Sequence, residues 1–450
     1  MIPLYSLAWL LATPLVMAYL LWRSIRQPAY RGHWGERFGW HPRRAGSQPL
    51  IWLHAVSVGE TRAAQPLVKA LAAKYPQAHV LITCMTPTGR ETAHELFAKA
   101  LGDRFHQAYL PYDQAGAQRR FLHSWRPTVG LLMETELWPN LMAAATQAHV
   151  PVALVSARLS QKSLAQGLRQ RALIVPAAQR LARVLAQSEG DAARIAQLLG
   201  RPVDAVTGNL KFDNAPDEVL LARGRGWRSR IGRQVVLAAS TREGEEALVL
   251  DAWQRGVLQR PGPQSDTAAA SKPLVVIVPR HPQRFDAVAR ESLEHGLRTA
   301  RRAALDDPHF DASSIDVLIG DSMGEMDAWY ALADVTLMGG SWLPFGSQNL
   351  IEPCAAGCPV LIGPSTFNFA DAAVGAIAAG AVVQLQTLDE AIDSALTLLR
   401  NAPARSDMAK AGAAFAAEHR GATQRTLAAL EAMLSVVGQA DQLRQDRRTP

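Results

Sequence analysis

The chain has 450 residues, of which 48% are hydrophobic and 19% charged, and it carries a formal net charge of +7. This length predicts two or three domains, and the composition excludes a disordered or fibrous protein. The small positive excess favours acidic partners such as phosphates, nucleotides or an anionic membrane. Nucleic acid is not indicated, because the sequence has no basic run interleaved with aromatic residues. Three cysteines cannot form a disulfide framework and fit a reducing compartment.

The first segment, residues 1–22, is apolar enough to be a membrane anchor. No side chain from Ile2 to Trp22 is charged, and the run is long enough to cross a bilayer as a helix. Arginines follow at once in a basic membrane-proximal connector, residues 23–49, so the positive-inside rule keeps the rest of the chain on the cytoplasmic side. We expect a single-pass N-terminal anchor. The alternative is a helix that is buried in the protein or lies in the membrane interface.

Strand and helix patterns alternate regularly from residue 50 onward. Short apolar runs are each followed by polar residues and then by apolar residues at helical spacing. The predicted strands are residues 51–56, 79–84, 128–133, 152–155 and 184–187 in the first half, and 235–239, 274–278, 315–319, 335–338 and 360–362 in the second. This alternation predicts parallel sheets with a functional edge at the carboxyl ends of the strands.

Two consecutive series of similar size predict an α/β protein with two Rossmann-like domains that face one another. The segment from Val203 to Asp213 is a candidate hinge. We therefore assign residues 50–212 to an N-terminal domain and residues 213–437 to a C-terminal domain, followed by a polar tail, residues 438–450.

Glu60 lies at the first strand-to-helix turn, at the edge of the sheet where ligands bind in open α/β folds. A carboxylate there can act as a general base when a substrate hydroxyl comes within hydrogen-bond reach. The alternative is a glutamate that only complements the helix dipole, since acidic residues are common in a first helical turn.

The second half has the layout of a nucleotide-sugar donor site. Arg280 follows one strand, glycine-rich loops follow two others, and a turn at residues 347–349 opens a helix whose N–H groups can bind phosphate. Glu352 can accept hydrogen bonds from ribose hydroxyls. The alternative is that Arg280 and Glu352 are ordinary surface charges. No Asp-x-Asp motif stands at a strand end, so we expect no metal and no cofactor.

Many short motifs in one order point to a known family. They are Trp34–Gly39, His54–Glu60, Met85–Gly89, Met133–Asn140, Ala157–Ser160, Leu210–Asp213, Pro279–Pro282, Gly324–Met326, Gly363–Pro364 and Phe367–Phe369. With these motifs the chain resembles the 3-deoxy-D-manno-octulosonic acid (Kdo) transferases of Gram-negative lipopolysaccharide assembly, over nearly its whole length.

The resemblance implies a GT-B type glycosyltransferase whose two domains face each other across a cleft, with an N-terminal anchor in the inner membrane. The donor would be CMP-Kdo, and the acceptor the phosphorylated, acylated glucosamine disaccharide of the lipid A precursor. Glu60 would be the general base, assisted by Glu134 and Lys211. The residues that would contact CMP are Pro279, Arg280, Met323, Gly324, Glu325, Asn349, Leu350, Ile351 and Glu352.

One departure and two rival functions remain. The family commonly has Gly-Gly-His-Asn before the helix at Glu352, whereas this chain has a glutamine, Gln348, which can donate a hydrogen bond but cannot become cationic. The nearest rival is another GT-B type nucleotide-sugar enzyme, such as a UDP-sugar epimerase or a lipid-linked glycosyltransferase. A silent, membrane-anchored carbohydrate-binding protein is a rival of another class, but such a binder needs no base, unlike the triplet of Glu60, Glu134 and Lys211.

Overall fold

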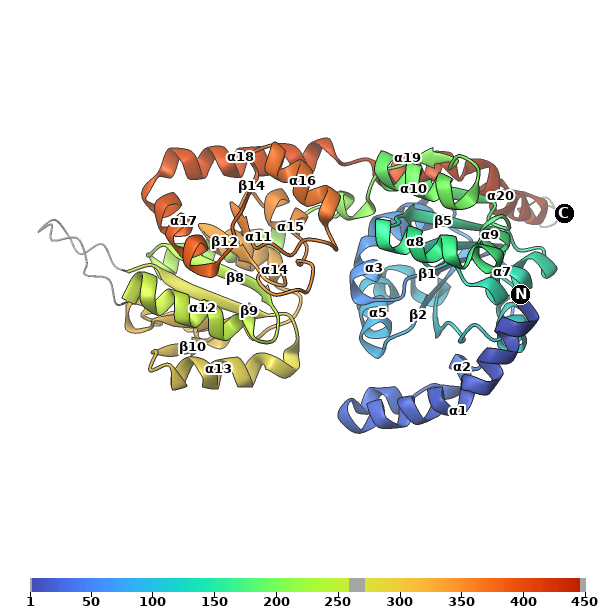
Figure 1. Cartoon of the computed structure of the whole chain (residues 1–450), viewed down its shortest axis with the longest axis horizontal. Coiled ribbons are helices and arrows are strands. Elements are labelled where there is room, and N and C mark those ends of the chain that lie inside the picture. Colours follow the sequence, from blue (N-terminus) through green and yellow to red (C-terminus); the bar gives the residue numbers. More distant parts are fainter. Residues whose placement is uncertain (1, 259–271, 446–450) are drawn as a thin grey trace, which may run out of the picture. The chain divides into compact units, whose positions relative to one another are not determined.

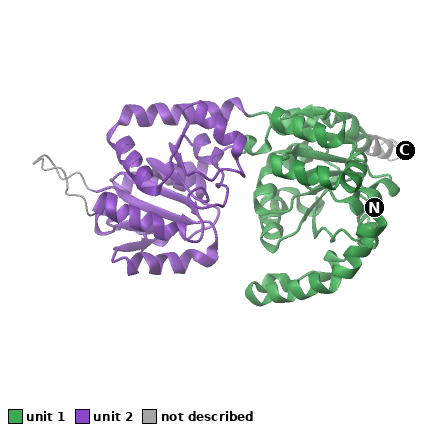
Figure 2. Cartoon of the chain, viewed as in Figure 1, with its two compact units in different colours: residues 1–214, 420–450 green, residues 215–419 purple. Residues whose placement is uncertain are grey.

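The computed structural model describes residues 2–258 and 272–445, and these form two compact units. The first unit comprises residues 1–214 and 420–450, and the second comprises residues 215–419 (Figure 2). Each unit is a parallel seven-stranded sheet covered by helices on both faces (Figure 1). Two such units in one chain make the GT-B type architecture expected from the sequence.

The sheet of the first unit has the strand order β3-β2-β1-β4-β5-β6-β7. Its strands are β1 Leu50–His54, β2 His79–Cys84, β3 Phe105–Tyr109, β4 Val129–Met133, β5 Val152–Ala157, β6 Arg183–Ala186 and β7 Ala205–Val206. The chain order runs outward from β1 on one side and outward from β4 on the other. The boundary between β1 and β4 is therefore the topological switch point, where ligands bind in open parallel sheets.

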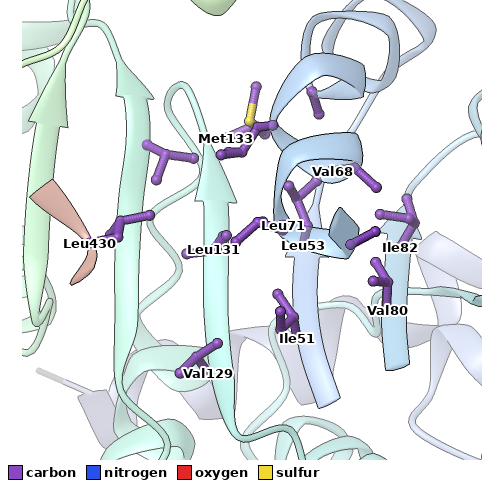
Figure 3. Packing of buried hydrophobic residues seen from close by; sticks show 14 of the residues in the cluster. Ile51, Leu53, Val68, Leu71, Val80, Ile82, Val129, Leu131, Met133 and Leu430 are labelled. Atoms are coloured by element: carbon purple, nitrogen blue, oxygen red, sulfur yellow. The ribbon is translucent and has the colours of Figure 1, made fainter. Parts of the chain in front are cut away.

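Side chains of the central strands alternate between two apolar clusters, one on each face of this sheet. Ile51 and Leu53 of β1 belong to one cluster, and Leu50 and Trp52 belong to the other. This burial on both faces explains why the sequence shows continuous apolar runs rather than alternation with polar residues. Figure 3 shows the first cluster, in which β1, β2 and β4 contribute facing aliphatic side chains.

Helices complete the first unit. They are α1 Ile2–Arg26, α2 Trp34–Arg37, α3 Val58–Ala63, α4 Gln65–Lys74, α5 Pro87–Leu101, α6 Ala115–Trp125, α7 Pro139–Gln147, α8 Gln161–Arg169, α9 Arg171–Ala178, α10 Glu189–Leu199, α19 Ala422–Ala429 and α20 Glu431–Gln445, with the 3-10 turns η1 Pro28–Arg31, η2 Gly102–Arg104 and η3 Leu210–Asp213.

The C-terminal helices correct the expected domain boundaries. The sequence assigned residues 213–437 to the second domain, but α19 and α20 pack into the core of the first unit, where Leu430 lies against the cluster of β1 and β4 (Figure 3). Asp213 fixes their entry, because its carboxylate accepts hydrogen bonds from the backbone N–H groups of Gly421 and Thr423. The expected polar tail is helical as far as Gln445, and residues 446–450 lie outside the described residues.

The second unit repeats the same plan with the strand order β10-β11-β9-β8-β12-β13-β14, so its switch point lies between β8 and β12. The strands are β8 Val235–Thr241, β9 Leu274–Pro279, β10 Thr299–Arg301, β11 Val317–Ile319, β12 Val335–Met338, β13 Val360–Ile362 and β14 Val382–Gln384. The helices are α11 Glu218–Ile231, α12 Glu245–Trp253, α13 Phe285–Glu294, α14 Met326–Leu332, α15 Ile351–Ala355, α16 Ala370–Ala378, α17 Leu388–Arg400 and α18 Ala402–Glu418.

The apolar N-terminal segment forms one long helix, α1. Among the described residues it is the one helix long and apolar enough to cross a membrane. Its outward side chains are mostly large and apolar, with exposed fractions between 42% for Met17 and 74% for Leu15. The hydroxyl groups of Ser6 and Thr13 instead bond to the rest of the first unit. This distribution reverses that of a helix on the surface of a soluble protein, and it fits contact with lipid.

Candidate active site

The site in the first unit begins at Glu60, the third residue of α3, directly after the switch-point strand β1. Ser57 caps this helix, since its hydroxyl accepts a hydrogen bond from the N–H of Glu60. The Glu60 carboxylate accepts bonds from the N–H of Val56 at 3.0 Å and from the Ser57 hydroxyl at 3.3 Å. The side chain is therefore held in one orientation at the sheet edge, as a positioned base requires.

The surroundings of Glu60 raise the pKa of its carboxyl to about 7. Burial is the largest cause, and the negative charge of Glu134 is the next. A carboxyl that titrates near neutral pH is a stronger base than an ordinary glutamate and is still ionised in a large fraction of molecules. These properties go beyond what dipole complementation at a helix start requires.

The pKa of Glu60 predicts the pH dependence of the reaction. A general base must be deprotonated, so we expect kcat/KM to rise about tenfold per pH unit below about pH 7 and to level off above it. In Glu134→Gln a like charge is lost, so the rising limb should move to lower pH. The measurement is kcat/KM from pH 5 to 9 for both proteins. A limb centred near the ordinary glutamate pKa of ~4.3 in the unmodified chain would contradict the role of Glu60.

Glu134 and Lys211 lie together, although their positions in the chain are far apart. Glu134 follows β4, across the switch point from β1, and Lys211 lies in η3. The Lys211 Nζ donates to Glu134 Oε1 at 2.9 Å, and the Arg158 Nε lies 2.8 Å from Oε2. Burial acts to raise the pKa of Glu134, but the charges of Lys211 and Arg158 outweigh it and hold the pKa below its ordinary value.

The backbone at Glu134 is unusual, since its φ angle is 54°. Non-glycine residues rarely adopt this left-handed conformation, and where they do so they cluster at functional sites. Two further bonds hold it: the N–H of Glu134 donates to the carbonyl of Val155 and the N–H of Arg158 donates to the carbonyl of Glu134. The buried, negatively charged carboxylate is thus fixed between two cations beside Glu60.

Sequence reasoning missed three residues of this site. Arg158 stands in a quoted motif but had no assigned role, because its pairing with Glu134 is visible only in three dimensions. Glu136 has a pKa raised by burial, and it accepts a hydrogen bond from the indole of Trp138 at 2.8 Å. The Trp138 ring lies edge to face with the buried ring of His54 at the end of β1, 5.7 Å between centroids.

In the second unit, cations gather after β8 and β9. Pro279 ends β9, and the N–H of Arg280 continues the sheet by donating to the carbonyl of Thr241. Partial burial and the charges of Arg280 and Arg242 lower the pKa of His281, so these three side chains share one region. Arg242 also lies over the ring of Phe345, 4.6 Å from its centroid. The sequence singled out Arg280 but not Arg242, which presents a second guanidinium for a phosphate or carboxylate.

Met323, Gly324 and Glu325 form the turn between β11 and α14. Met323 is 53% exposed, and Gly324 has a φ angle of 77°, which glycine adopts without strain. The Glu325 carboxylate receives two hydrogen bonds from Arg302 and one each from Arg223 and Ser322. It is already engaged within the protein, so it supports the shape of this turn even without a ligand.

The four residues at the start of α15 divide into two kinds. Leu350 and Ile351 are almost fully buried. Asn349 donates to Glu352 Oε1 at 3.0 Å and accepts from the N–H of Ile351. The sequence predicted a helix at residues 350–356, and the helix is Ile351–Ala355. The structure therefore offers the Asn349 and Glu352 side chains as a linked polar pair.

The motif at Phe367–Phe369 supports the loop before α15. Asn368 donates its side-chain N–H to the carbonyl of Phe345, and its backbone N–H to the carbonyl of Gly346. Gly346 has a φ angle of 85°, and a Cβ there would lie 2.5 Å from the ring of Phe367. Gly346 is therefore required by both conformation and space, and Gln348 stands two residues further on in this fixed loop.

A buried carboxylate, Glu245, organises the glycine-rich loop after β12. This side chain is fully buried at the start of α12 and accepts hydrogen bonds from the backbone N–H groups of Gly340, Trp342, Leu343 and Arg242. It thus ties the loop after β8 to the loop after β12, across the switch point of the second sheet. No sequence pattern indicates this role, because most of the partners are backbone groups far along the chain.

We expect Glu245→Gln to lower the free energy of unfolding of the second unit by about 2–3 kcal/mol. The substitution replaces one carboxylate oxygen, which accepts hydrogen bonds, by an NH2 group, which is a donor and faces other N–H donors. Thermal unfolding of the full-length protein, followed by tryptophan fluorescence, measures this loss. Glu243→Gln is the matched control, since Glu243 is exposed two residues away. Equal melting temperatures for the two variants would contradict the role of Glu245.

No metal centre is evident in the described part of the chain: residues 2–258 and 272–445 contain no group of three or more His, Cys, Asp or Glu side chains placed to hold an ion. The polar groups at both switch points are instead carboxylates, cations and backbone amides.

Comparison with known proteins decides the family. Residues 32–214 match the family described as 3-deoxy-D-manno-octulosonic-acid transferase (kdotransferase). A 3-deoxy-D-manno-octulosonic acid transferase of Bordetella pertussis is 47% identical over 441 residues, which cover 95% of this chain and 98% of that protein. The chain belongs to the Kdo transferase family. Another Kdo transferase, from Haemophilus influenzae, is 31% identical and covers 96% of this chain and 98% of its own length.

Family membership makes the chain a glycosyltransferase that transfers Kdo, and it confirms the resemblance found in the sequence motifs. A solved structure supports the architecture. The UDP-GlcNAc 2-epimerase from Neisseria meningitidis matches 85% of this chain and 99% of its own, with a TM-score of 0.55 at 16% sequence identity. At this identity the likeness concerns the GT-B type fold alone. The alternative function, a UDP-sugar epimerase, therefore gains no support beyond the shared architecture.

Proposed function

We propose that the chain moves Kdo from CMP-Kdo to a sugar hydroxyl of the lipid A precursor, a phosphorylated and acylated glucosamine disaccharide, and releases CMP, in lipopolysaccharide core biosynthesis. One observation carries this proposal beyond family membership. Glu60, with a pKa near 7, lies beside a buried Glu134 that is paired with Lys211 and Arg158. This arrangement supplies a base together with fixed cations in one unit.

The proposed reaction is a direct displacement at the anomeric carbon of Kdo. Glu60 accepts the proton of the acceptor hydroxyl while the oxygen of that hydroxyl forms the new bond to the anomeric carbon. The bond from the carbon to the phosphate oxygen breaks, and CMP leaves with the bonding electrons. Charge develops on both oxygens in the transition state, so preorganised cations and N–H dipoles stabilise it more than the ground state. Lys211 contributes by holding Glu134 in place and by its own charge.

The donor residues belong to the second unit. Arg280, assisted by Arg242, would neutralise the phosphate of CMP-Kdo with its guanidinium. Asn349 and Glu352 would bind ribose hydroxyls, and Pro279, Leu350 and Ile351 would contribute through their backbone. Met323, Gly324 and Glu325 would shape the surface against the nucleotide. Neutralisation by these groups requires no metal ion and no cofactor, and we propose none.

We further propose that the enzyme works at the inner membrane, on its cytoplasmic side, held there by α1. Both halves of α1 contact the first unit: Ser6 donates to Asn140 at 2.8 Å, and Arg23 lies 4.5 Å from the ring centroid of Tyr30. A helix that crosses the bilayer would have its first turns surrounded by lipid tails. These contacts therefore favour the alternative retained from the sequence, in which the helix lies in the membrane interface.

Transfer itself is the test of the proposal. Purified protein is incubated with CMP-Kdo and the tetra-acylated, bis-phosphorylated disaccharide, and the products are identified by mass spectrometry. We expect the acceptor to gain Kdo. CMP should inhibit the transfer, whereas UDP should not. If UDP competes while CMP does not, another GT-B type nucleotide-sugar enzyme explains the chain better. The same spectra give the number of Kdo residues added.

The outward face of α1 should control membrane binding. We expect the double substitution of Leu11→Glu and Leu15→Glu to weaken binding to anionic phospholipid vesicles at least tenfold, because two exposed leucines no longer enter the apolar layer. Vesicle flotation of the full-length protein measures the change. Val219→Glu is the control, since Val219 is 71% exposed on α11. Unchanged flotation of the double variant would show that α1 is not the anchor.

A further inference from the structure

A cavity of about 340 Å³ lies in the first unit between α1, α7 and α9. Aromatic and aliphatic side chains dominate its wall, which includes Tyr5, Trp9, Tyr112, Trp138, Leu173 and Ile174. The first turns of α1 form one side of the cavity, and α9 supplies Leu173 and Ile174 on another. Figure 1 shows α1 beginning close to α7 and bending away along its length. A proline inside the helix, Pro14, accounts for a bend.

Two buried polar side chains near this cavity, Asp113 and Asn140, are already hydrogen-bonded. The buried Asp113 carboxylate accepts hydrogen bonds from the N–H groups of Asn140 and Leu141, at 3.0 and 2.8 Å. The Asn140 side chain bonds in turn to Ser6 of α1 and to the carbonyl of Asp113. The hydrogen bonds of these groups hold α1 against α7 and are not available to a ligand. The cavity wall therefore suits an apolar occupant.

The helix that closes the cavity is also the helix that carries the lipid-facing surface. Its inner side is latched by hydrogen bonds from Ser6 to Asn140 and from Gln114 to Thr13, and by the stacking of Trp9 on Tyr112 with 6.0 Å between centroids. Its outer side exposes leucines, among them Leu7 and Leu11. The exposed leucines and the cavity-lining residues Tyr5 and Trp9 therefore belong to the same helix.

One residue of the cavity wall, Trp138, also contacts the candidate active site. Trp138 lines the cavity, and its indole N–H donates to Glu136, whose charge acts on Glu60. The ring of Trp138 also packs against His54 at the end of β1. Trp138 thus contacts both the cavity and Glu136, a carboxylate that acts on the general base.

We propose that this cavity binds one acyl chain of the lipid acceptor and so positions its sugar hydroxyl at Glu60. The inference rests on the proposed function, because the acceptor supplies the chain. It assigns α1 a second task besides anchoring: the helix forms part of the acceptor site. Each buried methylene strengthens binding about fourfold, so burial of a few methylenes would favour the acylated over the bare disaccharide.

Photo-crosslinking tests the binding without requiring turnover. The probe is the bis-phosphorylated disaccharide with a diazirine at the middle of one acyl chain, added in detergent to the full-length protein without CMP-Kdo. We expect adducts on the peptides that contain Trp9 or Ile174, and competition by the unlabelled acceptor. Labelling confined to the outward leucines of α1 would overturn the proposal. A second probe is a phosphatidylglycerol that carries the same diazirine chain. The proposal would also be overturned if this lipid labelled the same peptides and the unlabelled acceptor did not compete with it.

A cavity-filling substitution tests the effect on catalysis. We expect Ile174→Trp to raise the KM for the tetra-acylated acceptor at least tenfold, by filling the space of several methylenes, and to leave kcat nearly unchanged. The control is Ala172→Trp, which adds the same indole to an exposed position of α9 outside the cavity wall. Leu173→Ala enlarges the cavity and serves as a second variant if Ile174→Trp does not fold.

The outcomes separate this inference from the proposed function. Kdo transfer with equal KM values for Ile174→Trp and Ala172→Trp would overturn the cavity as an acyl site and leave the transferase assignment intact. If the unmodified chain shows no Kdo transfer but its cavity is still labelled, the proposed reaction fails and the cavity remains an acyl-binding site. For Leu173→Ala, we expect a changed preference for acyl-chain length. The same preference as the unmodified chain would count against the proposal.

Discussion

Glu60→Gln should lower the rate of Kdo transfer by about a hundredfold to ten-thousandfold, the range for the loss of a positioned general base. Glutamine retains the size of the side chain and can still accept one hydrogen bond, but it cannot take the proton of the acceptor hydroxyl. Binding of CMP should remain almost unchanged, because the residues proposed to bind the donor belong to the second unit. Initial rates beside calorimetric titration of CMP measure both quantities.

The matched control for Glu60→Gln is Ser57→Ala, which removes the cap of α3 and one hydrogen bond to the carboxylate but leaves the base itself. We expect it to lower the rate far less. Glu60→Gln should also lose the rising limb of the pH profile near pH 7, which a merely structural defect would not remove. Transfer by Glu60→Gln at close to the original rate would show that another group accepts the proton.

Lys211→Ala should lower turnover by about a hundredfold, as for the loss of one preorganised electrostatic contact, with little effect on CMP binding. It leaves the buried Glu134 with Arg158 as its remaining cationic partner. The positive charge of Lys211 lowers the pKa of Glu60, so its removal should shift the rising limb of the pH profile to higher pH. That shift is opposite in sign to the one expected for Glu134→Gln.

Two other variants define the role of Lys211. Lys74→Ala removes an exposed lysine paired with Glu431 in the same unit, and it should leave the rate unchanged. Arg280→Ala should instead weaken CMP binding in the ground state and weaken inhibition by CMP. If Lys211→Ala loses CMP affinity while Arg280→Ala keeps it, the two assignments are reversed.

The sequence predicted the interior of both sheets and missed their edges. All four strands without a predicted counterpart, β3, β7, β10 and β14, are the outermost strands of their sheets. An interior strand such as β12 is buried along its whole length and appears in the sequence as a continuous apolar run. An edge strand such as β10, Thr299–Arg301, is partly exposed and polar, and its strand conformation depends on a neighbour rather than on its own residues.

The candidate site was predictable where a residue follows a central strand. Glu60, Glu134 and Arg280 follow interior strands that were predicted as apolar runs, and Glu134 was singled out by its place in a family motif. Arg158, Arg242 and Glu245 required the structure, because their roles arise from pairing with groups distant in sequence. The assignment of residues 420–437 failed for a similar reason: a helix with an apolar face does not indicate which core covers it.

The return of α19 and α20 to the first unit has a consequence for synthesis on the ribosome. The second unit, residues 215–419, is in effect an insertion into the first, which is completed only when residues 420–445 have been translated. Until then the apolar face that receives Leu430 and Leu434 stays uncovered while the whole second unit emerges. A nascent or truncated chain that ends before Gly421 therefore exposes a surface prone to aggregation, whereas residues 215–419 can close their own core without the final helices.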